Sequence, residues 1–372
     1  MRILHVVPTY LPARRYGGPI VAVHGLCAAL ARRGNDVHVF TTNVDGNRES
    51  DVPLDQDVLI DGVRVRYFRS TIRRLYVSPG MTRALQSIEA FDVIHNHSVF
   101  LWPTAAAAHA ANRSRVPYVI APRGMLVPEL IERKSSFVKR AWIRLVEYRN
   151  FERAAAIHFT SQRELDDARD VGVPIPRAIV IPNGIDVRPL PDVPREDRTI
   201  VYLGRVNWKK RLDRLIESVS KIEGVRVIIA GNDEESLTPA LTELAVRLGV
   251  AKRVEFVGPL YDDAKWNLLA RAAVFVLPSL SENFGNVVLE AMAMETPVVL
   301  SPGVGLAEDV AAAEAGIVSD ELAPAINELL SDPMRAAAMG KNGRWLVESQ
   351  FTWDSVAARM EDAYRCLIPL RP

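Results

Sequence analysis

The sequence predicts an α/β protein with two doubly wound parallel sheets in tandem. Short runs of apolar and β-branched residues alternate with amphipathic helical patterns along the chain, which is typical of parallel sheets covered by helices on both faces. The length of 372 residues is enough for two or three domains. Residues 182–198 hold four prolines, an Asn-Gly turn and several charged residues, which is the composition of a linker.

The predicted strands follow in order along both halves. In the first half we expect them at residues 2–7, 37–40, 92–96, 118–121, 157–160 and 179–181, and in the second half at residues 199–202, 225–230, 254–257, 274–277 and 297–300. This order places a first domain at 1–185, a linker at 186–198 and a second domain at 199–350. Such sheets bind ligands at the carboxyl ends of their strands, so we expect the two domains to face each other across a cleft.

The last segment, residues 351–372, is expected to form a helix. Its pattern places four residues with apolar side chains on one helical face, which are Trp353, Val356, Met360 and Tyr364. We expect this helix to pack near the junction of the two domains.

The composition narrows the class of protein. Apolar residues make up 48% of the chain, and its longest uncharged apolar runs are shorter than the roughly 18 residues of a spanning helix. The first residues read as a strand rather than a signal peptide. Cys27 and Cys366 are expected to be free thiols. These features predict a cytoplasmic enzyme, and no nucleic-acid partner is expected.

The segment SENFGNVVLEAM, residues 281–292, places two acids eight positions apart around a turn. Glu282 is expected on a loop at the carboxyl end of a strand, and Glu290 one turn beyond Asn286 on the following helix. The backbone amides at the start of that helix suit a phosphate, and they belong to Phe284, Gly285, Asn286 and Val287. Two carboxylates can also accept hydrogen bonds from the hydroxyls of a sugar. The alternative is that Glu282 caps the helix or is solvated, and that Glu290 is a paired core acid.

The segment VYLGRVNWKKRL, residues 201–212, places Arg205 and Lys210 just after a predicted strand. Two cations at this edge of the sheet could converge on a diphosphate. Cations at the start of a helix oppose its dipole, which is unfavourable unless an anion is bound. The alternative is a solvated basic helix start.

Two motifs in the first half are weaker. Gly17 and Gly18 come between the first strand and a helix, where they would let the backbone approach a phosphate or sugar, although a plain tight turn is equally compatible. His97 follows a strand and is expected to point into the cleft, whereas His95 is expected to point into the sheet. The pair could bind a metal, but no further ligand is evident nearby, so no metal is expected.

With these motifs in order, the chain resembles the family 4 retaining glycosyltransferases, which have the GT-B architecture of two Rossmann-like domains. The resemblance spans essentially the whole chain. It rests on GGP (17–19), HNH (95–97), PNGID (182–186), GRVNWKK (204–210) and PSLSENFGNVVLEAM (278–292). It implies a nucleotide-diphosphate sugar donor, transfer of a hexosyl group with retained configuration, and a site that needs neither a metal nor another cofactor.

The resemblance also implies roles for the residues. Arg205 and Lys210 would neutralise the donor diphosphate, and Glu290 would bind the ribose hydroxyls. Glu282 would hold hydroxyls of the transferred sugar together with the amides of residues 284–287. Gly17 and Gly18 would lie over the diphosphate, His97 would contact the sugar near its reacting face, and Val257 would border the base. A uridine diphosphate sugar is the favoured donor and a guanosine diphosphate sugar the second choice.

The acceptor is expected to be lipid-linked or a saccharide, in bacterial surface-polysaccharide or glycolipid synthesis. Before residue 190 the chain has 26 Lys/Arg and 18 Asp/Glu, so 26 − 18 = +8, and after it 20 − 27 = −7. Residues 132–153 read as a basic amphipathic helix, which indicates contact with an anionic membrane on the inner face of the plasma membrane. A surface helix that packs on its own sheet is the alternative. Arg123 could meet a phosphate of the acceptor.

Two rival functions keep the predicted architecture. One is a non-hydrolysing sugar-nucleotide epimerase, for which we can place no acid and base residues around the sugar. The other is a non-catalytic nucleotide-sugar-binding protein. Release of sugar and nucleoside diphosphate from a donor would separate a transferase from a binding protein.

Overall fold

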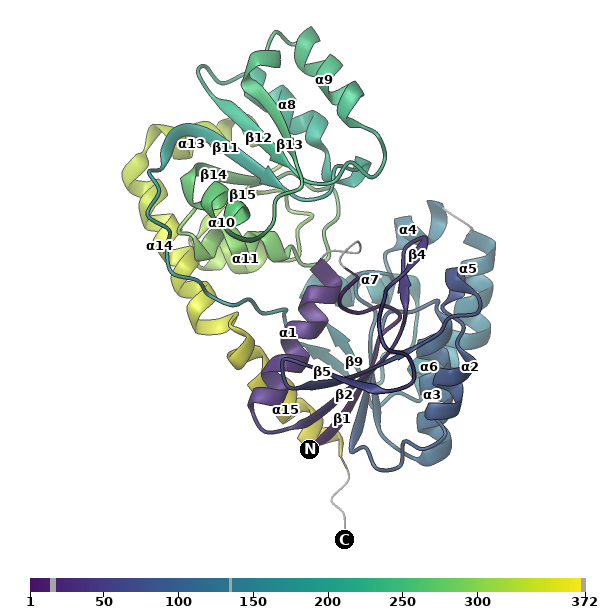
Figure 1. The fold of residues 1–372 in the computed structure, drawn as a ribbon. Coiled ribbons are helices and arrows are strands. Elements are labelled where there is room, and N and C mark those ends of the chain that lie inside the picture. The colour runs from purple at the N-terminus through teal and green to yellow at the C-terminus, as the bar shows by residue number, and fades with distance from the viewer. Residues whose placement is uncertain (14–17, 134–135, 369–372) are drawn as a thin grey trace. The chain divides into compact units, whose positions relative to one another are not determined.

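The protein divides into two compact units (Figure 1). The computed structural model describes residues 1–13, 18–133 and 136–368. Unit 1 comprises Met1–Gly184 and Trp353–Pro372, and unit 2 comprises Ile185–Thr352. The two expected doubly wound sheets are both present, one in each unit.

Unit 1 is built on an eight-stranded sheet in the order β10-β9-β8-β7-β1-β2-β6-β5. All neighbouring strands are parallel except β5 and β6, which pair antiparallel. The strands are β1 (Arg2–Val6), β2 (Asp36–Thr42), β5 (Asp57–Ile60), β6 (Val63–Phe68), β7 (Val93–His97), β8 (Tyr118–Ala121), β9 (Ala156–Phe159) and β10 (Ala178–Val180). A separate two-stranded ribbon contains β3 (Val44–Asp45) and β4 (Arg48–Glu49).

Helices cover both faces of this sheet. One face packs against α1 (Gly18–Arg32) and α15 (Trp353–Leu367), which contact each other. The other face packs mainly against α2 (Pro79–Ala84), α3 (Trp102–Ser114), α6 (Tyr148–Glu152) and α7 (Gln162–Val171). The remaining helices of unit 1 are η1 (Arg73–Leu75), α4 (Pro128–Arg133), α5 (Ser136–Trp142) and the π-helical turn η2 (Ile143–Glu147).

The C-terminal helix α15 belongs to unit 1 and packs on α1. The four residues of its predicted stripe are all buried in the core beneath it, namely Trp353, Val356, Met360 and Tyr364. Trp353 lies against two glycines, because a Cβ at Gly25 or Gly184 would fall 2.2 or 2.7 Å from its indole ring. The expected C-terminal segment is therefore an integral part of the first unit.

Unit 2 has a six-stranded parallel sheet in the order β13-β12-β11-β14-β15-β16. Its strands are β11 (Glu196–Leu203), β12 (Arg226–Ala230), β13 (Val254–Gly258), β14 (Ala272–Leu277), β15 (Val298–Leu300) and β16 (Gly316–Val318). Its helices are η3 (Trp208–Lys210), α8 (Leu212–Ser220), α9 (Thr238–Arg247), η4 (Ala251–Arg253), α10 (Asp262–Arg271), α11 (Asn286–Ala293), α12 (Ala307–Ala312), α13 (Leu322–Ser331) and α14 (Pro333–Gln350). One continuous apolar core fills the space between sheet and helices.

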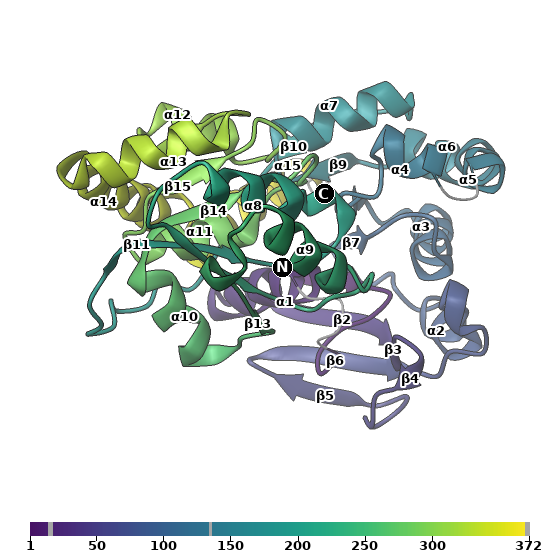
Figure 2. The ribbon, with the colours of Figure 1, turned by 90° about the horizontal axis from the view of Figure 1, so that it is seen from above.

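Three parts of the fold differ from the sequence-based prediction. The prediction missed β5 and β6, which continue the first sheet beyond β2 (Figure 2). It also missed β16 at the edge of the second sheet. The strand expected at 199–202 begins at Glu196, inside the segment expected to be a linker. Glu196 forms ion pairs with Arg226 and Arg271, so polar contacts rather than apolar residues fix the first part of β11.

Crossing a bilayer requires a helix that is both long and strongly apolar. Over residues 1–13, 18–133 and 136–368, no helix combines these two properties.

Candidate active site

The turn after β11 carries the two predicted cations, Arg205 and Lys210. β11 ends at Leu203, and the turn continues into η3, whose last residue is Lys210. The Tyr202 hydroxyl donates a hydrogen bond of 2.8 Å to the carbonyl of Arg205, and the Val206 N–H donates one of 2.8 Å to a carbonyl in the turn after β12. These bonds fix the backbone around Arg205 at the carboxyl edge of the sheet.

The turns after β11 and β12 contact each other at two glycines. Gly204 and Gly231 have φ angles of 153° and 152°. A Cβ at Gly231 would lie 1.7 Å from the carbonyl oxygen of Gly204. Only a hydrogen atom fits between the two turns, so glycine is required at 231 for the Arg205 turn to keep its position.

Each predicted cation is paired with a carboxylate of the same unit. Lys210 forms an ion pair with Glu282, and both side chains are largely buried. Arg205 forms an ion pair of 3.1 Å with Glu234, in the turn after β12, and this pair is exposed. Tyr202 lies near both pairs: burial raises the pKa of its hydroxyl well above the usual value, Glu282 raises it further and Arg205 lowers it. Arg205, Lys210 and Glu282 therefore share one edge of the sheet.

The loop that carries Glu282 is held by its backbone. The N–H of Glu282 donates to the carbonyl of Gly303 at 2.9 Å, and the carbonyl of Glu282 accepts from Gly305 at 2.8 Å. The N–H of Leu280 donates to the carbonyl of Lys209 at 2.8 Å, which ties this loop to η3. The loop that carries Glu282 and the turn that carries Lys210 therefore lie beside each other, and hydrogen bonds fix their backbones.

The helix after this loop begins where the sequence predicts it. α11 starts at Asn286, and its N-cap is Gly285 with φ of 97°, a left-handed conformation that favours glycine. Phe284 is buried and its ring lies 6.2 Å from that of Phe351. The amino end of a helix attracts anions through its dipole and its backbone amides, so the start of α11, at residues 286 and 287, suits an anion.

Glu290 lies one helical turn beyond Asn286 and also has a partner. Its carboxylate forms an ion pair of 2.8 Å with Lys265 on α10, and both side chains are about one-fifth exposed. Val257 lies on β13, at the edge of the sheet, and is 37% exposed. Its predicted contact with the base stays a prediction.

The remaining predicted residues lie in unit 1. Gly17 falls outside the described residues, and Gly18 is the exposed first residue of α1. His97 is the last residue of β7 and is fully buried. We expected His97 to point into the cleft and His95 into the sheet, and this contrast between the two side chains is wrong. Residues two apart in a strand share a face, so His95 and His97 lie side by side with ring centroids 4.2 Å apart.

Four buried histidines form two hydrogen-bonded pairs on this face of the sheet. His97 Nε2 lies 2.9 Å from His5 Nδ1, and His95 Nε2 lies 3.3 Å from His158 Nδ1. The hydroxyl of Tyr364, on α15, lies 2.6 Å from His95 Nδ1. Burial lowers the pKa of His5 and of His158 to about 3, and it lowers the pKa of His95 and of His97 well below the usual value. All four rings are therefore neutral at pH 7.

The ring nitrogens of His5, His95 and His97 lie within 4.8 Å of one another, a spacing that a metal ion could occupy. The lone pairs of these nitrogens are instead used to accept hydrogen bonds. Arg123 can only donate, so His97 Nδ1 accepts from it and Nε2–H donates to His5. His158 Nε2–H donates to the carbonyl of Ile181, so its Nδ1 accepts a hydrogen bond from His95 Nε2–H. The Nδ1 of His95 then accepts a hydrogen bond from the hydroxyl of Tyr364. In this arrangement the rings keep no lone pair for a metal, and the expected metal-free reaction remains a prediction.

Acid is expected to destabilise the fold through these histidines. A histidine in the unfolded chain has a pKa of about 6.5. Above that pH neither state is protonated. Below it the histidines are protonated in the unfolded chain but not in the folded chain. The free energy of unfolding therefore falls by about 1.4 kcal/mol per pH unit for each histidine, until the pH reaches the folded pKa. For His5 and His158 this window extends down to about pH 3.

Urea unfolding at pH 7.0, 6.0 and 5.0 measures this effect. We expect the free energy of unfolding to fall steeply below pH 6.5. The slope of this free energy against pH gives the number of protons taken up on unfolding, and His158→Gln should reduce that number by about one. His109→Gln is the matched control, because His109 is exposed on α3. An unchanged slope in His158→Gln would contradict the assignment.

Arg123 joins the ends of three strands of unit 1. It follows β8, and its guanidinium donates from Nε and Nη2 to His97 Nδ1, at 3.3 and 3.2 Å. Its Nη1 donates to Asn183 Oδ1, beyond β10, at 2.9 Å. The residue is half-buried, and burial lowers the pKa of its guanidinium. The structure thus brings two of the predicted residues, His97 and Arg123, into contact.

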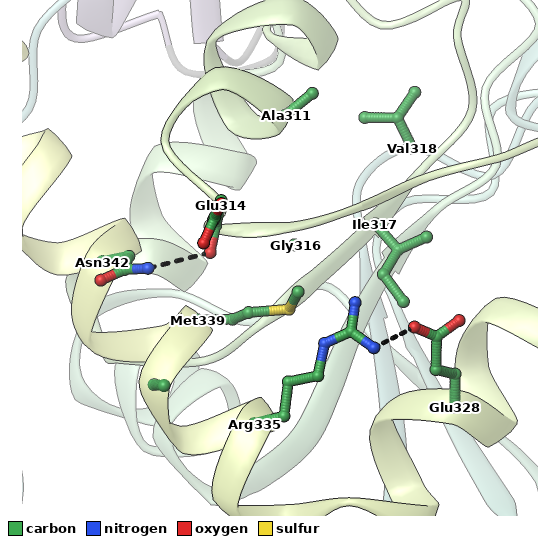
Figure 3. Close-up of a pocket in the computed structure, with 10 residues that line it drawn as sticks. Ala311, Glu314, Gly316, Ile317, Val318, Glu328, Arg335, Met339 and Asn342 are labelled. Atoms are coloured by element: carbon green, nitrogen blue, oxygen red, sulfur yellow. Dashed lines mark hydrogen bonds and ion pairs between the residues drawn. The ribbon is translucent and has the colours of Figure 1, made fainter.

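A separate cavity of about 440 Å³ lies in unit 2 and contains none of the predicted residues (Figure 3). It is bordered by β16, α12, α13 and α14. Its lining includes an ion pair between Arg335 and Glu328. It also includes a hydrogen bond that Asn342 donates to the carbonyl of Glu314. Its lining has mixed charge, and no group there is aimed at a particular ligand.

The sequence-based prediction missed five residues that hold the predicted ones in place. Glu234 and Lys265 pair with Arg205 and Glu290. His5, Tyr364 and Asn183 contact the cluster of histidines or Arg123. Of these, only His5 could have been noticed in the sequence, because it is a polar residue inside an apolar strand. The others meet their partners across 25 to 269 positions of the chain, so local patterns do not reveal them.

Comparison with known proteins assigns a family to both units. Residues 17–184 match the family described as glycosyl transferase 4-like domain, and residues 188–345 match glycosyl transferases group 1. Glycogen synthase from Mycobacterium tuberculosis is 30% identical over 98% of this chain and 94% of its own length. D-inositol 3-phosphate glycosyltransferase from Jonesia denitrificans is 26% identical over 98% and 95%.

A solved structure extends the comparison to the fold. The Anabaena protein HepE in complex with UDP superposes with a TM-score of 0.77 at 21% identity, covering 98% of this chain and 100% of that one. The two parallel sheets, each wound on both faces, are the two Rossmann-like domains of the GT-B fold. The chain belongs to the group 1 glycosyl transferases.

Proposed function

We propose that the protein transfers a hexosyl group, with retained configuration, from a nucleotide-diphosphate sugar to a saccharide or lipid-linked acceptor. The observation that carries this proposal is the grouping of Arg205, Lys210 and Glu282 beside the amino end of α11 in unit 2. Cations and backbone amides at one sheet edge suit a diphosphate, and the two carboxylates suit hydroxyls.

The chemistry of the transfer requires these groups. As the bond between the anomeric carbon and the phosphate oxygen breaks, the sugar gains oxocarbenium character and the electron pair leaves with the diphosphate. Arg205, Lys210 and the amides of α11 would stabilise this charge. The acceptor hydroxyl would attack from the same face, and its proton would pass to the departing phosphate oxygen. No metal or other cofactor is needed in this route.

Glu290 is proposed to bind the ribose hydroxyls and Glu282 the hydroxyls of the transferred sugar. Both carboxylates are now paired with lysines, which leaves each of them further lone pairs for a hydroxyl. His97 is proposed to contact the sugar. Contact through its ring would require the bond to His5 or to Arg123 to open.

A uridine diphosphate sugar is the proposed donor, and a guanosine diphosphate sugar is the second choice. The UDP complex of HepE supports this order. The test is a panel of UDP- and GDP-sugars, with release of nucleoside diphosphate measured with and without simple sugar acceptors. Turnover of one donor supports the proposal. Binding without release would favour a binding protein, and conversion of the sugar without release would favour an epimerase.

The basic segment of unit 1 supports a lipid-linked acceptor at an anionic membrane. Residues 136–152 form one continuous helix, in which α5, the π-helical turn η2 and α6 follow each other without a break. Phe137 is 84% and Leu145 73% exposed, while exposed basic residues such as Arg140 and Arg144 lie between them. Exposed apolar side chains beside cations are the combination that binds an anionic bilayer surface.

Membrane binding is expected to depend on these exposed side chains. Substituting Phe137 and Leu145 by serine should reduce co-sedimentation with vesicles that contain phosphatidylglycerol at low salt by about tenfold. Neutral phosphatidylcholine vesicles are the lipid control. Exposed Leu59 on β5 offers the matched variant, Leu59→Ser, since it lies elsewhere on the same unit. Equal sedimentation of all variants would remove the membrane from the proposal.

A further inference from the structure

The guanidinium of Arg123 has only neutral partners. Its hydrogen bonds go to His97 and Asn183, and the ring of His97 is neutral. Among the described residues, no carboxylate lies within ion-pair distance of it, although the structure forms many such pairs elsewhere. A partly buried cation without an acid is costly, because it gives up water without gaining a counter-charge.

Glu164 is the acid whose charge acts on Arg123, but it does not form an ion pair with it. Its Oε1 accepts from the N–H of Gly124 at 2.7 Å. Its Oε2 accepts from the N–H and the hydroxyl of Thr160 at 2.7 and 2.8 Å. The carboxylate therefore holds the backbone of the turn that carries Arg123. Burial lowers the pKa of the guanidinium and the charge of Glu164 raises it, but the two groups do not form an ion pair.

The backbone of this turn is strained. Arg123 and Gly124 have φ angles of 55° and 73°, so two successive residues are left-handed. Such a conformation is unfavourable for arginine and persists only where its surroundings enforce it. Here Glu164 enforces it, and the result is that the guanidinium reaches back between the ends of β7 and β10 at the carboxyl edge of the sheet.

The hydrogen-bonding capacity of Arg123 is not exhausted. Each terminal nitrogen carries two N–H groups, and one of the two on Nη1 and one of the two on Nη2 serve Asn183 and His97. One N–H on each terminal nitrogen remains. These two N–H groups belong to one charged guanidinium, and each can donate a charge-assisted hydrogen bond to a phosphate oxygen.

We infer that Arg123 binds the phosphate group of a phosphorylated acceptor in unit 1. This inference rests on the proposed function and specifies the class of its acceptor, either a sugar phosphate or a polyprenyl phosphate. The donor diphosphate is assigned to different cations, Arg205 and Lys210 of unit 2. The anion would supply the direct ion pair that Glu164 does not form.

The test is titration of the full-length protein at constant ionic strength, with sodium chloride as the reference salt. Glucose 6-phosphate represents the soluble source, a short polyprenyl phosphate in detergent represents the lipid source, and glucose and the matching prenol are the neutral controls. We expect at least one phosphate compound to raise the melting temperature of the wild type above both references. If neither does, the inference is wrong, and this result does not depend on any variant.

Variants then locate the phosphate. Arg123→Met should weaken binding of that compound at least about tenfold, and Arg123→Lys should restore part of it because the charge returns without the two N–H groups of the guanidinium. Arg169→Met is the matched control, since Arg169 is an exposed arginine of α7 in the same unit. Unchanged affinity in Arg123→Met would overturn the inference.

The melting temperature measured with UDP shows whether this inference or the proposed function has failed. A melting shift with UDP but with no phosphate compound would leave the donor site standing and remove the acceptor phosphate. A phosphate shift without any turnover of nucleotide sugars would leave Arg123 standing and remove the proposed transfer.

Discussion

Replacing Lys210 or Arg205 by alanine is expected to lower kcat by on the order of 10²–10³ for each variant. Both side chains would face charge that develops on the leaving diphosphate, so their removal should affect kcat more than KM. The measurement is steady-state release of nucleoside diphosphate from the donor identified in the panel.

Lys209→Ala is the matched control for Lys210→Ala, because both lysines belong to η3. Removing Lys210 also leaves the carboxylate of Glu282 without its ion-pair partner. The melting temperature of each variant should therefore be measured beside kcat, and Lys210→Met with Glu282→Gln separates the loss of the pair from the loss of the cation. A folded Lys210→Ala enzyme with wild-type kcat would contradict the proposed role.

The second large effect is expected from Gly231→Ala. The new Cβ would fall 1.7 Å from the carbonyl oxygen of Gly204, so one of the two turns must move. Overpacking combined with the left-handed backbone should reduce the free energy of unfolding by about 3–5 kcal/mol. Because the displaced turn carries Arg205, nucleotide binding should weaken even where the variant folds.

Gly249→Ala gives the reference for backbone strain alone. Gly249 also has a positive φ, 70°, but a Cβ there would meet nothing within 4 Å. We expect it to cost about 1–2 kcal/mol. Urea unfolding of both variants measures the difference, and equal losses would show that the contact between the turns does not matter.

The fold could be predicted where apolar strands carry the signal. Tyr118–Ala121 lies where the sequence places it, because four successive buried residues mark a central parallel strand. The antiparallel pair β5 and β6 was missed because charged residues interrupt its apolar positions, Asp57 in β5 and Arg64 and Arg66 in β6. Asp61 and Gly62, with φ angles of 48° and 80°, do form the kind of Asp-Gly turn that indicates a hairpin.

The candidate site was predictable where its residues directly follow strands. Arg205 and Glu282 could be placed at one sheet edge because β11 and β14 are neighbours in a parallel sheet. The ion-pair partner of Arg205 could not, since Glu234 lies in the turn of another strand. The orientation of His97 was misjudged because its position at the end of β7 was read as a loop.

Three ion pairs at the candidate site of unit 2 have a consequence for how a donor arrives. Three cations, Arg205, Lys210 and Lys265, face three carboxylates, Glu234, Glu282 and Glu290, so this surface has almost no net charge. Long-range attraction of an anionic nucleotide should therefore be weak, and its association rate should vary little with ionic strength. Selectivity would then arise after encounter, when phosphate oxygens compete with Glu234 and Glu282 for partners that are already satisfied.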